Sequence, residues 1–176
     1  MSVHLILGGA RSGKSSFAET LVLKAEAKLT RHYIATAQPF DEEMERRIAH
    51  HQERRGESWT EHECPIALAE LISQFQATDI VLVDCLTLWM NNVIYNQGKP
   101  VTEDQIRSQV LHLVEALNAS DAKIVLVSNE VGLGVVPMGE VTRLFVDHAG
   151  WMNQAVAKVA KQVIFIAAGL PLELKG

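Results

Sequence analysis

The run Gly8–Ser15, which reads Gly-Gly-Ala-Arg-Ser-Gly-Lys-Ser, is the first feature of this sequence with a chemical meaning. It matches the pattern G-x-x-x-x-G-K-[ST], in which glycines let successive backbone N–H groups point at the α- and β-phosphates of a nucleotide. In this pattern Lys14 can reach the β- and γ-phosphate oxygens, and the hydroxyl of Ser15 can join the ligands of Mg²⁺. The alternative is a glycine-rich turn without a ligand.

The flanking residues favour the phosphate-binding interpretation. An apolar stretch, Val3–Leu7, precedes the run and a helical pattern, Ser16–Lys28, follows it. This is the order of strand, loop and helix that the pattern requires, and the helix adds the positive end of its dipole. We therefore predict that the chain binds a nucleoside triphosphate. The predicted phosphate loop consists of Gly8, Gly9, Ala10, Arg11, Ser12, Gly13, Lys14 and Ser15.

A second nucleotide element is predicted at Ile80–Asp84, an apolar strand that ends in a carboxylate. In proteins with a phosphate loop, such a carboxylate holds Mg²⁺ directly or through a water molecule. We predict this role for Asp84. The alternative is that Asp84 caps the helix that begins near Leu86.

The segment Asp41–Arg55 predicts a helix with an unusual polar face. Its side chains Arg47, His50, His51 and Arg54 recur at spacings of three or four residues and form a basic face that carries imidazoles. Adjacent histidines diverge by about 100° around a helix, which disfavours a metal site. A solvated, charged helix is the simpler interpretation. In a protein that binds triphosphates, however, such a face could hold phosphate or supply a nucleophilic imidazole.

A third polar segment, Ser128–Pro137, directly follows a strand that is predicted to be buried. Ligands of open α/β sheets bind outside the carboxyl ends of the strands, so this segment is a candidate substrate loop. The alternative is an ordinary connection between a strand and a helix. The sequence has no N-K-x-D motif and no D-x-x-G motif after Asp84, which argues against a signalling GTPase.

Alternating strands and helices would position these segments. Apolar runs predict strands, and periodic runs between them predict helices. The predicted strands are Val3–Leu7, His32–Ala35, a short Ser58–Glu63, Ile80–Val83, Ile124–Val127 and Val163–Ala167. The predicted helices are Ser15–Lys28, Asp41–Arg55, Pro65–Phe75, Leu86–Tyr95, Thr102–Leu117 and Val141–Ala160. We also predict a loop at Asn96–Pro100 and a capping box between Thr102 and Gln105. This order predicts an α/β fold with a doubly wound, mostly parallel sheet of the P-loop NTPase type, in a single domain over residues 1–176.

Bulk properties restrict the class of protein further. With 176 residues, one core is ample, and a formal net charge of −5 gives no general attraction to nucleic acid or to an anionic membrane. Cys64 and Cys85 lack the spacing of metal ligands and have no secretory context, so we expect reduced thiols. No apolar run reaches the length of a membrane span. We expect a soluble, cytoplasmic enzyme.

The chain resembles the bifunctional adenosylcobinamide kinase/adenosylcobinamide-phosphate guanylyltransferases of cobalamin biosynthesis. The resemblance covers nearly the whole chain and depends on the order and spacing of several blocks. These blocks are Gly8–Ser15, Tyr33–Ala37, Glu43-Met44 with Arg47–His51, Trp59, Glu63-Cys64, Ser128–Gly132 with Val136-Pro137, and the region near Gly169. At the position of Asp84 the family often has Glu, which can also reach Mg²⁺ but with a different geometry.

The resemblance implies two reactions. In the first, the γ-phosphoryl group of ATP or GTP passes to the hydroxyl of the aminopropanol arm of adenosylcobinamide. In the second, His50 attacks the α-phosphorus of GTP, and the GMP–histidine intermediate passes GMP to adenosylcobinamide phosphate, giving adenosylcobinamide-GDP and pyrophosphate. The resemblance further implies a homo-oligomer, a trimer, with the corrinoid near a subunit boundary. Besides the phosphate loop and Asp84, the residues expected at the nucleotide are Ala35, Thr36, Ala37, His51, Arg54 and Glu63.

Two alternatives from other classes remain open at the level of sequence. A P-loop kinase of small metabolites or nucleotides would share the phosphate loop but would not need His50. A nucleotide-binding switch or assembly ATPase would bind triphosphate without turning over a corrinoid.

Overall fold

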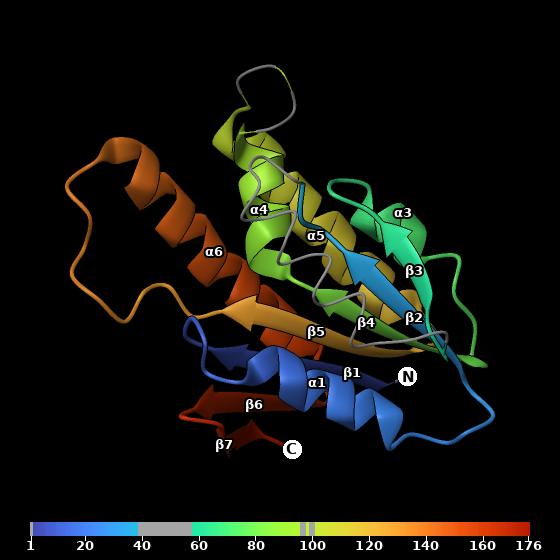
Figure 1. Cartoon of the computed structure of the whole chain (residues 1–176). Coiled ribbons are helices and arrows are strands. Elements are labelled where there is room, and N and C mark those ends of the chain that lie inside the picture. The colour runs from blue at the N-terminus through green and yellow to red at the C-terminus, as the bar shows by residue number, and fades with distance from the viewer. Residues whose placement is uncertain (1, 39–57, 96–97, 99–100) are drawn as a thin grey trace.

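Seven strands form one sheet with the order β3-β2-β4-β5-β1-β6-β7 (Figure 1). The structure is a computed structural model that describes residues 2–38, 58–95, 98 and 101–176. The strands are β1 (Ser2–Gly8), β2 (Thr30–Ala35), β3 (Thr60–Glu63), β4 (Asp79–Asp84), β5 (Lys123–Asn129), β6 (Gln162–Ala167) and β7 (Leu170–Lys175). All neighbouring strands are parallel except β6 and β7, which are antiparallel. The predicted doubly wound, mostly parallel sheet is therefore confirmed.

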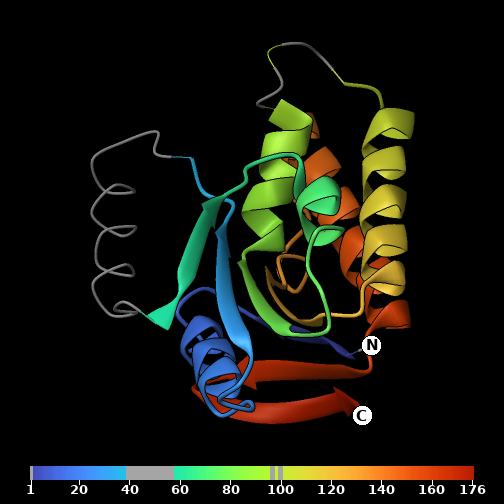
Figure 2. The ribbon, with the colours of Figure 1, turned by 90° about the vertical axis from the view of Figure 1, so that its right-hand side faces the viewer.

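Helices cover both faces of this sheet, as Figure 2 shows from the side. Helix α1 (Lys14–Leu23) lies on one face, where Ala18 and Val22 pack with Ile6 of β1 and Leu82 of β4. The opposite face is covered by α3 (Leu68–Ile72), α4 (Leu86–Tyr95), α5 (Glu103–Ala119) and α6 (Glu140–Val159). Parallel strands buried on both faces require the continuous apolar runs that the sequence shows.

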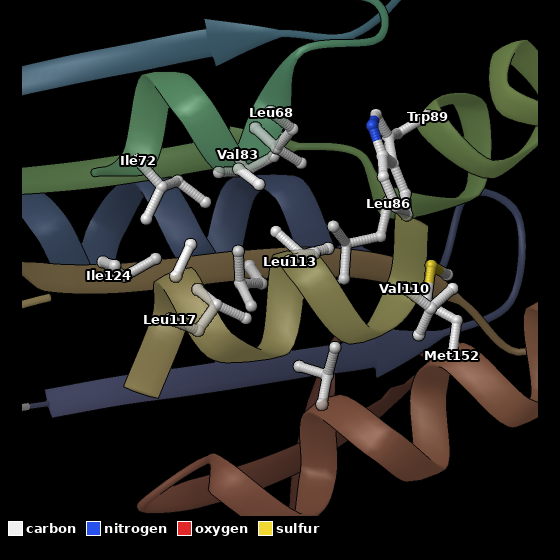
Figure 3. Packing of buried hydrophobic residues seen from close by; sticks show 14 of the residues in the cluster. Leu68, Ile72, Val83, Leu86, Trp89, Val110, Leu113, Leu117, Ile124 and Met152 are labelled. Carbon is white, nitrogen blue, oxygen red and sulfur yellow. The ribbon is translucent and has the colours of Figure 1, made fainter. Parts of the chain in front are cut away.

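The larger core lies between the sheet and the helices α3 to α6 (Figure 3). Leu113 and Leu117 of α5 are fully buried and point at the strands, together with Ile72 of α3 and Met152 of α6. Helix α5 begins with the predicted capping box. The backbone N–H of Gln105 donates to the Thr102 hydroxyl at 3.3 Å, and the N–H of Thr102 donates to the Gln105 side chain at 2.8 Å.

Two predicted helices were too long, and one strand was missed. Helix α1 ends at Leu23 rather than Lys28, because the chain turns there and places Leu29 in the core ahead of β2. The predicted helix Pro65–Phe75 is shorter, since α3 spans only Leu68–Ile72 and the carbonyls of Pro65 and Ile66 accept bonds from side chains of α4. Strand β7 was not predicted. The predicted helix Asp41–Arg55 and most of the loop Asn96–Pro100 lie outside the described residues.

Candidate nucleotide site at the carboxyl edge of the sheet

The predicted phosphate loop connects β1 to α1. Strand β1 ends at Gly8, and α1 begins at Lys14. Between them, Arg11 and Gly13 have φ values of 55° and 95°, which turn the backbone sharply. The Lys14 side chain is buried, and its ammonium donates to the carbonyl oxygen of Gly9 at 3.0 Å. The lysine is thus folded over the loop, where a phosphate group can take the place of a backbone carbonyl as its partner.

The loop is packed closely against its surroundings at Gly8. A Cβ on this residue would lie 2.5 Å from the Ser12 Oγ and 2.6 Å from the carbonyl oxygen of Ile166, so only glycine fits. The Ser12 Oγ is buried and has no hydrogen-bond partner among the described residues. A buried hydroxyl without a partner inside a turn of backbone N–H groups fits a loop that receives a phosphate.

Three of the predicted residues lie side by side across three strands. Ala35 at the end of β2 is in register with Glu63 at the end of β3 and with Asp84 at the end of β4. Strand β5 lies between β4 and β1 and brings this row to the phosphate loop, because Asn129 of β5 is in register with Gly8. The topology therefore gathers these segments at one edge of the sheet, where ligands of open α/β sheets bind.

The carboxylate of Asp84 accepts a hydrogen bond from the hydroxyl of Tyr33 at 3.1 Å. This bond fixes one carboxylate oxygen and leaves the acceptor capacity of the other for a ligand. Carboxylate and hydroxyl oxygens suit Mg²⁺, so the donor set of Asp84 and Ser15 fits this ion. Within the described ranges, no cluster of three or more His, Cys, Asp or Glu side chains could hold a metal. A magnesium ion here would take its other ligands from phosphate oxygens and water.

A set of buried hydrogen bonds fixes the backbone beside Asp84. The hydroxyl of Thr36 donates to the carbonyl oxygen of Cys85 at 2.7 Å and accepts from the Cys85 N–H at 2.9 Å. The side chain of Asn92 on α4 donates to the carbonyls of Thr36 at 2.8 Å and Pro65 at 3.1 Å. Thr36 is fully buried, and its bonds help to hold the segments that follow β2, β3 and β4 together. Cys64 and Cys85 are both buried, free thiols.

The segment after β5 begins beside the phosphate loop. The N–H of Glu130 donates to the carbonyl oxygen of Gly8 at 3.1 Å, which continues the ladder between β5 and β1. Further along, the segment carries exposed apolar side chains that include Leu133, Val135, Val136 and Met138. This segment thus starts beside the predicted phosphate loop and then extends into solvent.

The structure brings together only part of the predicted site. The phosphate loop, Ala35, Thr36, Ala37, Glu63 and Asp84 belong to segments that meet at this edge. His50, His51 and Arg54 lie outside the described residues. The sequence reasoning missed the bond from Tyr33 to Asp84. It also missed the contact between the phosphate loop and the turn at Ala168-Gly169, in which the N–H of Gly169 donates to the Ser12 carbonyl at 2.9 Å.

The fold and the phosphate loop together define a protein of the P-loop NTPase type. Solved structures agree with this class. A KaiC-like protein from Pyrococcus horikoshii OT3 matches with a TM-score of 0.51 and 12% identity, over 93% of this chain and 70% of that one. A prototypical ATPase from the type III secretion system of pathogenic bacteria matches with a TM-score of 0.55 and 14% identity, over 98% of this chain and 56% of that one. At such identities, the likeness extends to the fold alone.

The family follows from sequence comparison. The family model of cobinamide kinase/cobinamide phosphate guanyltransferase matches residues 4–174. The bifunctional adenosylcobalamin biosynthesis protein CobP of Pseudomonas aeruginosa is 51% identical over 173 residues, which are 98% of this chain and 96% of that protein. The bifunctional adenosylcobalamin biosynthesis protein CobU of Escherichia coli K12 is 37% identical, over 97% of this chain and 98% of that protein. The chain belongs to the cobinamide kinase/cobinamide phosphate guanyltransferase family.

Proposed function

We propose that the protein phosphorylates adenosylcobinamide with ATP or GTP and then transfers GMP from GTP to adenosylcobinamide phosphate. The observation that carries this proposal is the meeting of the phosphate loop with Asp84 at one edge of the sheet, in a chain of the cobinamide kinase/cobinamide phosphate guanyltransferase family. Phosphoryl transfer depends mainly on position and on charge stabilisation, which is what a backbone loop, a lysine and a carboxylate provide.

In the kinase step, the hydroxyl oxygen of the aminopropanol arm attacks the γ-phosphorus. A new P–O bond forms, the bond to the β–γ bridging oxygen breaks, and the nucleoside diphosphate leaves. The N–H groups of the loop and the Lys14 ammonium stabilise the charge on the phosphate oxygens. Mg²⁺, held by Ser15 and Asp84, would neutralise further charge on these oxygens.

In the guanylyl step, the neutral imidazole of His50 attacks the α-phosphorus of GTP and pyrophosphate leaves. The resulting phosphoramidate is then attacked by a phosphate oxygen of adenosylcobinamide phosphate, which yields adenosylcobinamide-GDP and restores the imidazole. The ordinary pKa of histidine, about 6.5, leaves most of the imidazole unprotonated at neutral pH. His51, Arg54, Ala35, Ala37 and Glu63 complete the nucleotide contacts in this proposal, with Thr36 acting through the backbone that it holds.

The setting of the reaction is also proposed. None of the described helices is long and apolar enough to cross a membrane. We expect the enzyme to work in the cytoplasm as a homo-oligomer, a trimer, with its corrinoid substrate near a boundary between subunits.

Covalent labelling tests the proposal. Incubation with α-labelled GTP should leave one GMP per chain, bound through a phosphoramidate that is labile to acid and stable to alkali. His50→Ala should abolish this label and guanylyl transfer, while much of the kinase step remains. The matched control is His112→Ala, because this half-exposed histidine lies on α5 and contacts Glu70. A protein that phosphorylates cobinamide without accumulating GMP would instead be a P-loop kinase that lacks the guanylyl step.

A further inference from the structure

Asn129, the last residue of β5, has a buried side-chain oxygen to which neither the phosphate loop nor Asp84 has been assigned as a partner. Its Oδ1 is inaccessible to solvent and has no hydrogen-bond partner among the residues that the structure describes. A buried amide oxygen without a donor is destabilising relative to one that is satisfied. Native proteins leave few such atoms unsatisfied, and an ordered water, an ion or a functional partner accounts for those that remain.

The position of Asn129 identifies which ligand is near. Side chains alternate along β5, and Val125 and Val127 pack in the cluster on the α1 face of the sheet. By the same alternation Asn129 lies on the α1 face, in register with Gly8, where the phosphate loop begins. Along β4, Ile80 and Leu82 pack in the same cluster, so Asp84, two residues further on, also lies on the α1 face. The amide therefore lies at the same edge and on the same face as the phosphate loop and the carboxylate.

The backbone of Asn129 is held rigidly from the opposite face. Its N–H donates to the hydroxyl of Thr87 at 2.7 Å, and its carbonyl accepts from the Asn153 side chain at 3.2 Å. The same Asn153 side chain accepts from the Ser128 hydroxyl at 2.7 Å, and the Ser128 and Thr87 hydroxyls lie 3.4 Å apart. Thr87, Ser128 and Asn153 are all buried. Helices α4 and α6 thus fix the end of β5, and a side chain that is positioned in this way loses little entropy on contacting a substrate.

The chemistry of the free atom limits its partner. An amide oxygen only accepts hydrogen bonds, whereas the oxygens of an ionised triphosphate cannot donate one. The loop N–H groups and the Lys14 ammonium can donate to the phosphate oxygens, whereas the hydroxyl that attacks the γ-phosphorus needs an acceptor of its own. We propose that Asn129 is a catalytic residue of the phosphoryl-transfer step and that its Oδ1 accepts a hydrogen bond from the acceptor hydroxyl. This inference rests on the kinase reaction proposed above.

In this role, Asn129 orients the hydroxyl and does not act as a base. The hydroxyl oxygen forms the bond to the γ-phosphorus, the bridging P–O bond breaks, and the hydroxyl proton is released to solvent. Because the amide is not basic, its effect is to aim a lone pair of the attacking oxygen at phosphorus. Misalignment of an attacking group costs about 10- to 100-fold in rate.

The test compares Asn129→Ala with Asn118→Ala, which changes an exposed asparagine on α5. Each enzyme is assayed with ATP and cobinamide for kcat, KM and the dissociation constant of a non-hydrolysable ATP analogue. We expect Asn129→Ala to lower kcat about 10- to 100-fold and to leave the dissociation constant of the analogue within about threefold. GMP labelling from GTP should stay near the wild-type rate, since that step uses a different acceptor. Asn118→Ala should behave as the wild type.

A second variant separates alignment from folding. Asn129→Asp keeps an acceptor oxygen in the same place, so its kcat should exceed that of Asn129→Ala, while its added negative charge should weaken binding of the analogue. Equal losses of kcat, analogue binding and GMP labelling in both variants would overturn the proposal in favour of a structural role. A wild-type kcat in Asn129→Ala would overturn it as well. Failure of the wild-type enzyme to phosphorylate cobinamide would contradict the proposed function instead.

Discussion

The backbone N–H of Gly169 donates a hydrogen bond to the carbonyl oxygen of Ser12 at 2.9 Å, which joins the C-terminal hairpin to the phosphate loop. Gly169 and Ala168, with φ values of 77° and 51°, form the two-residue turn between β6 and β7. Positive φ at both positions is typical of a type I′ turn. A Cβ built on Gly13 would lie 3.4 Å from the Cα of Gly169, so the turn also packs against the loop. The hairpin therefore supports the loop from the side opposite to β5.

Replacement of Gly169 tests this support. Gly169→Ala should destabilise the fold by about 1 kcal/mol, because alanine is strained at this positive φ although no atom lies near the added methyl group. Binding of triphosphate should weaken at the same time. The matched control is Gly150→Ala on α6, which has open space and should stabilise the fold by about 0.4–1 kcal/mol. Thermal unfolding measures the change in stability, and calorimetric titration measures the affinity for triphosphate. Equal changes in the two variants would show that the turn does not support the phosphate loop.

Lys14→Ala should weaken binding of triphosphate and abolish phosphoryl transfer. The loss of one charge-assisted contact costs about 1.5–3 kcal/mol, which corresponds to roughly a 10- to 150-fold higher dissociation constant. Titration with a non-hydrolysable analogue measures this change. Lys24→Ala, which removes an exposed lysine just after α1, serves as the control. Near-wild-type affinity in Lys14→Ala would place the nucleotide elsewhere.

Asp84→Asn should raise the concentration of Mg²⁺ needed for activity without unfolding the protein. The amide keeps an oxygen that can accept the bond from Tyr33, while the charge that would attract the cation is lost. Activity is titrated against Mg²⁺, with Asp121→Asn, at an exposed site before β5, as the control. An unchanged Mg²⁺ requirement together with a lower melting temperature would favour a purely structural role for this carboxylate.

Stability should fall as the pH falls through 6.5, in part because of His62. Burial and the neighbouring His32 lower the pKa of His62 from its ordinary value of 6.5. Below pH 6.5 the unfolded chain therefore binds a proton more readily than the folded chain, which favours unfolding. Burial also lowers the pKa of His148, which adds to the effect in the same direction.

Denaturation between pH 5 and 8 with His62→Gln checks this prediction. The variant should show a smaller loss of stability at low pH than the wild type, with His112→Gln as a control on the exposed side of α5. An identical pH profile in His62→Gln and the wild type would exclude His62 as a source of the loss.

Most of the fold could be predicted from the sequence because its strands are buried on both faces. The apolar runs at Ile80–Val83 and Ile124–Val127 leave little doubt about their role, and they became the centres of β4 and β5. Strand β7 escaped prediction because all six of its residues are exposed and it lies at the edge of the sheet. Its alternating leucines, Leu170, Leu172 and Leu174, are a local strand pattern that was overlooked, whereas its pairing with β6 depends on the folded sheet.

The positions of the motifs could be predicted, because strand ends in an α/β sheet converge at one edge. Gly8–Ser15 joins β1 to α1 and Asp84 ends β4, while their roles at a nucleotide stay predictions. The network of Thr87, Ser128 and Asn153 could not be predicted, since it joins three elements that are distant in sequence. Thr36 was expected among the residues at the nucleotide. Its two hydrogen bonds to the backbone of Cys85 could not be predicted, because the two residues are far apart in the sequence.

The bond pair between Thr36 and Cys85 has a consequence for the dynamics of this edge. Loops that bind ligands are usually among the least stable parts of a domain. Here the N–H of Cys85 is bound to a fully buried hydroxyl, and the side chain of Asn92 ties the neighbouring carbonyls to α4. The amide hydrogen of Cys85 should therefore exchange with deuterated solvent only through opening of the whole domain. The backbone around Thr36 and Cys85 would then already be ordered before a nucleotide binds, so binding would not have to order this segment.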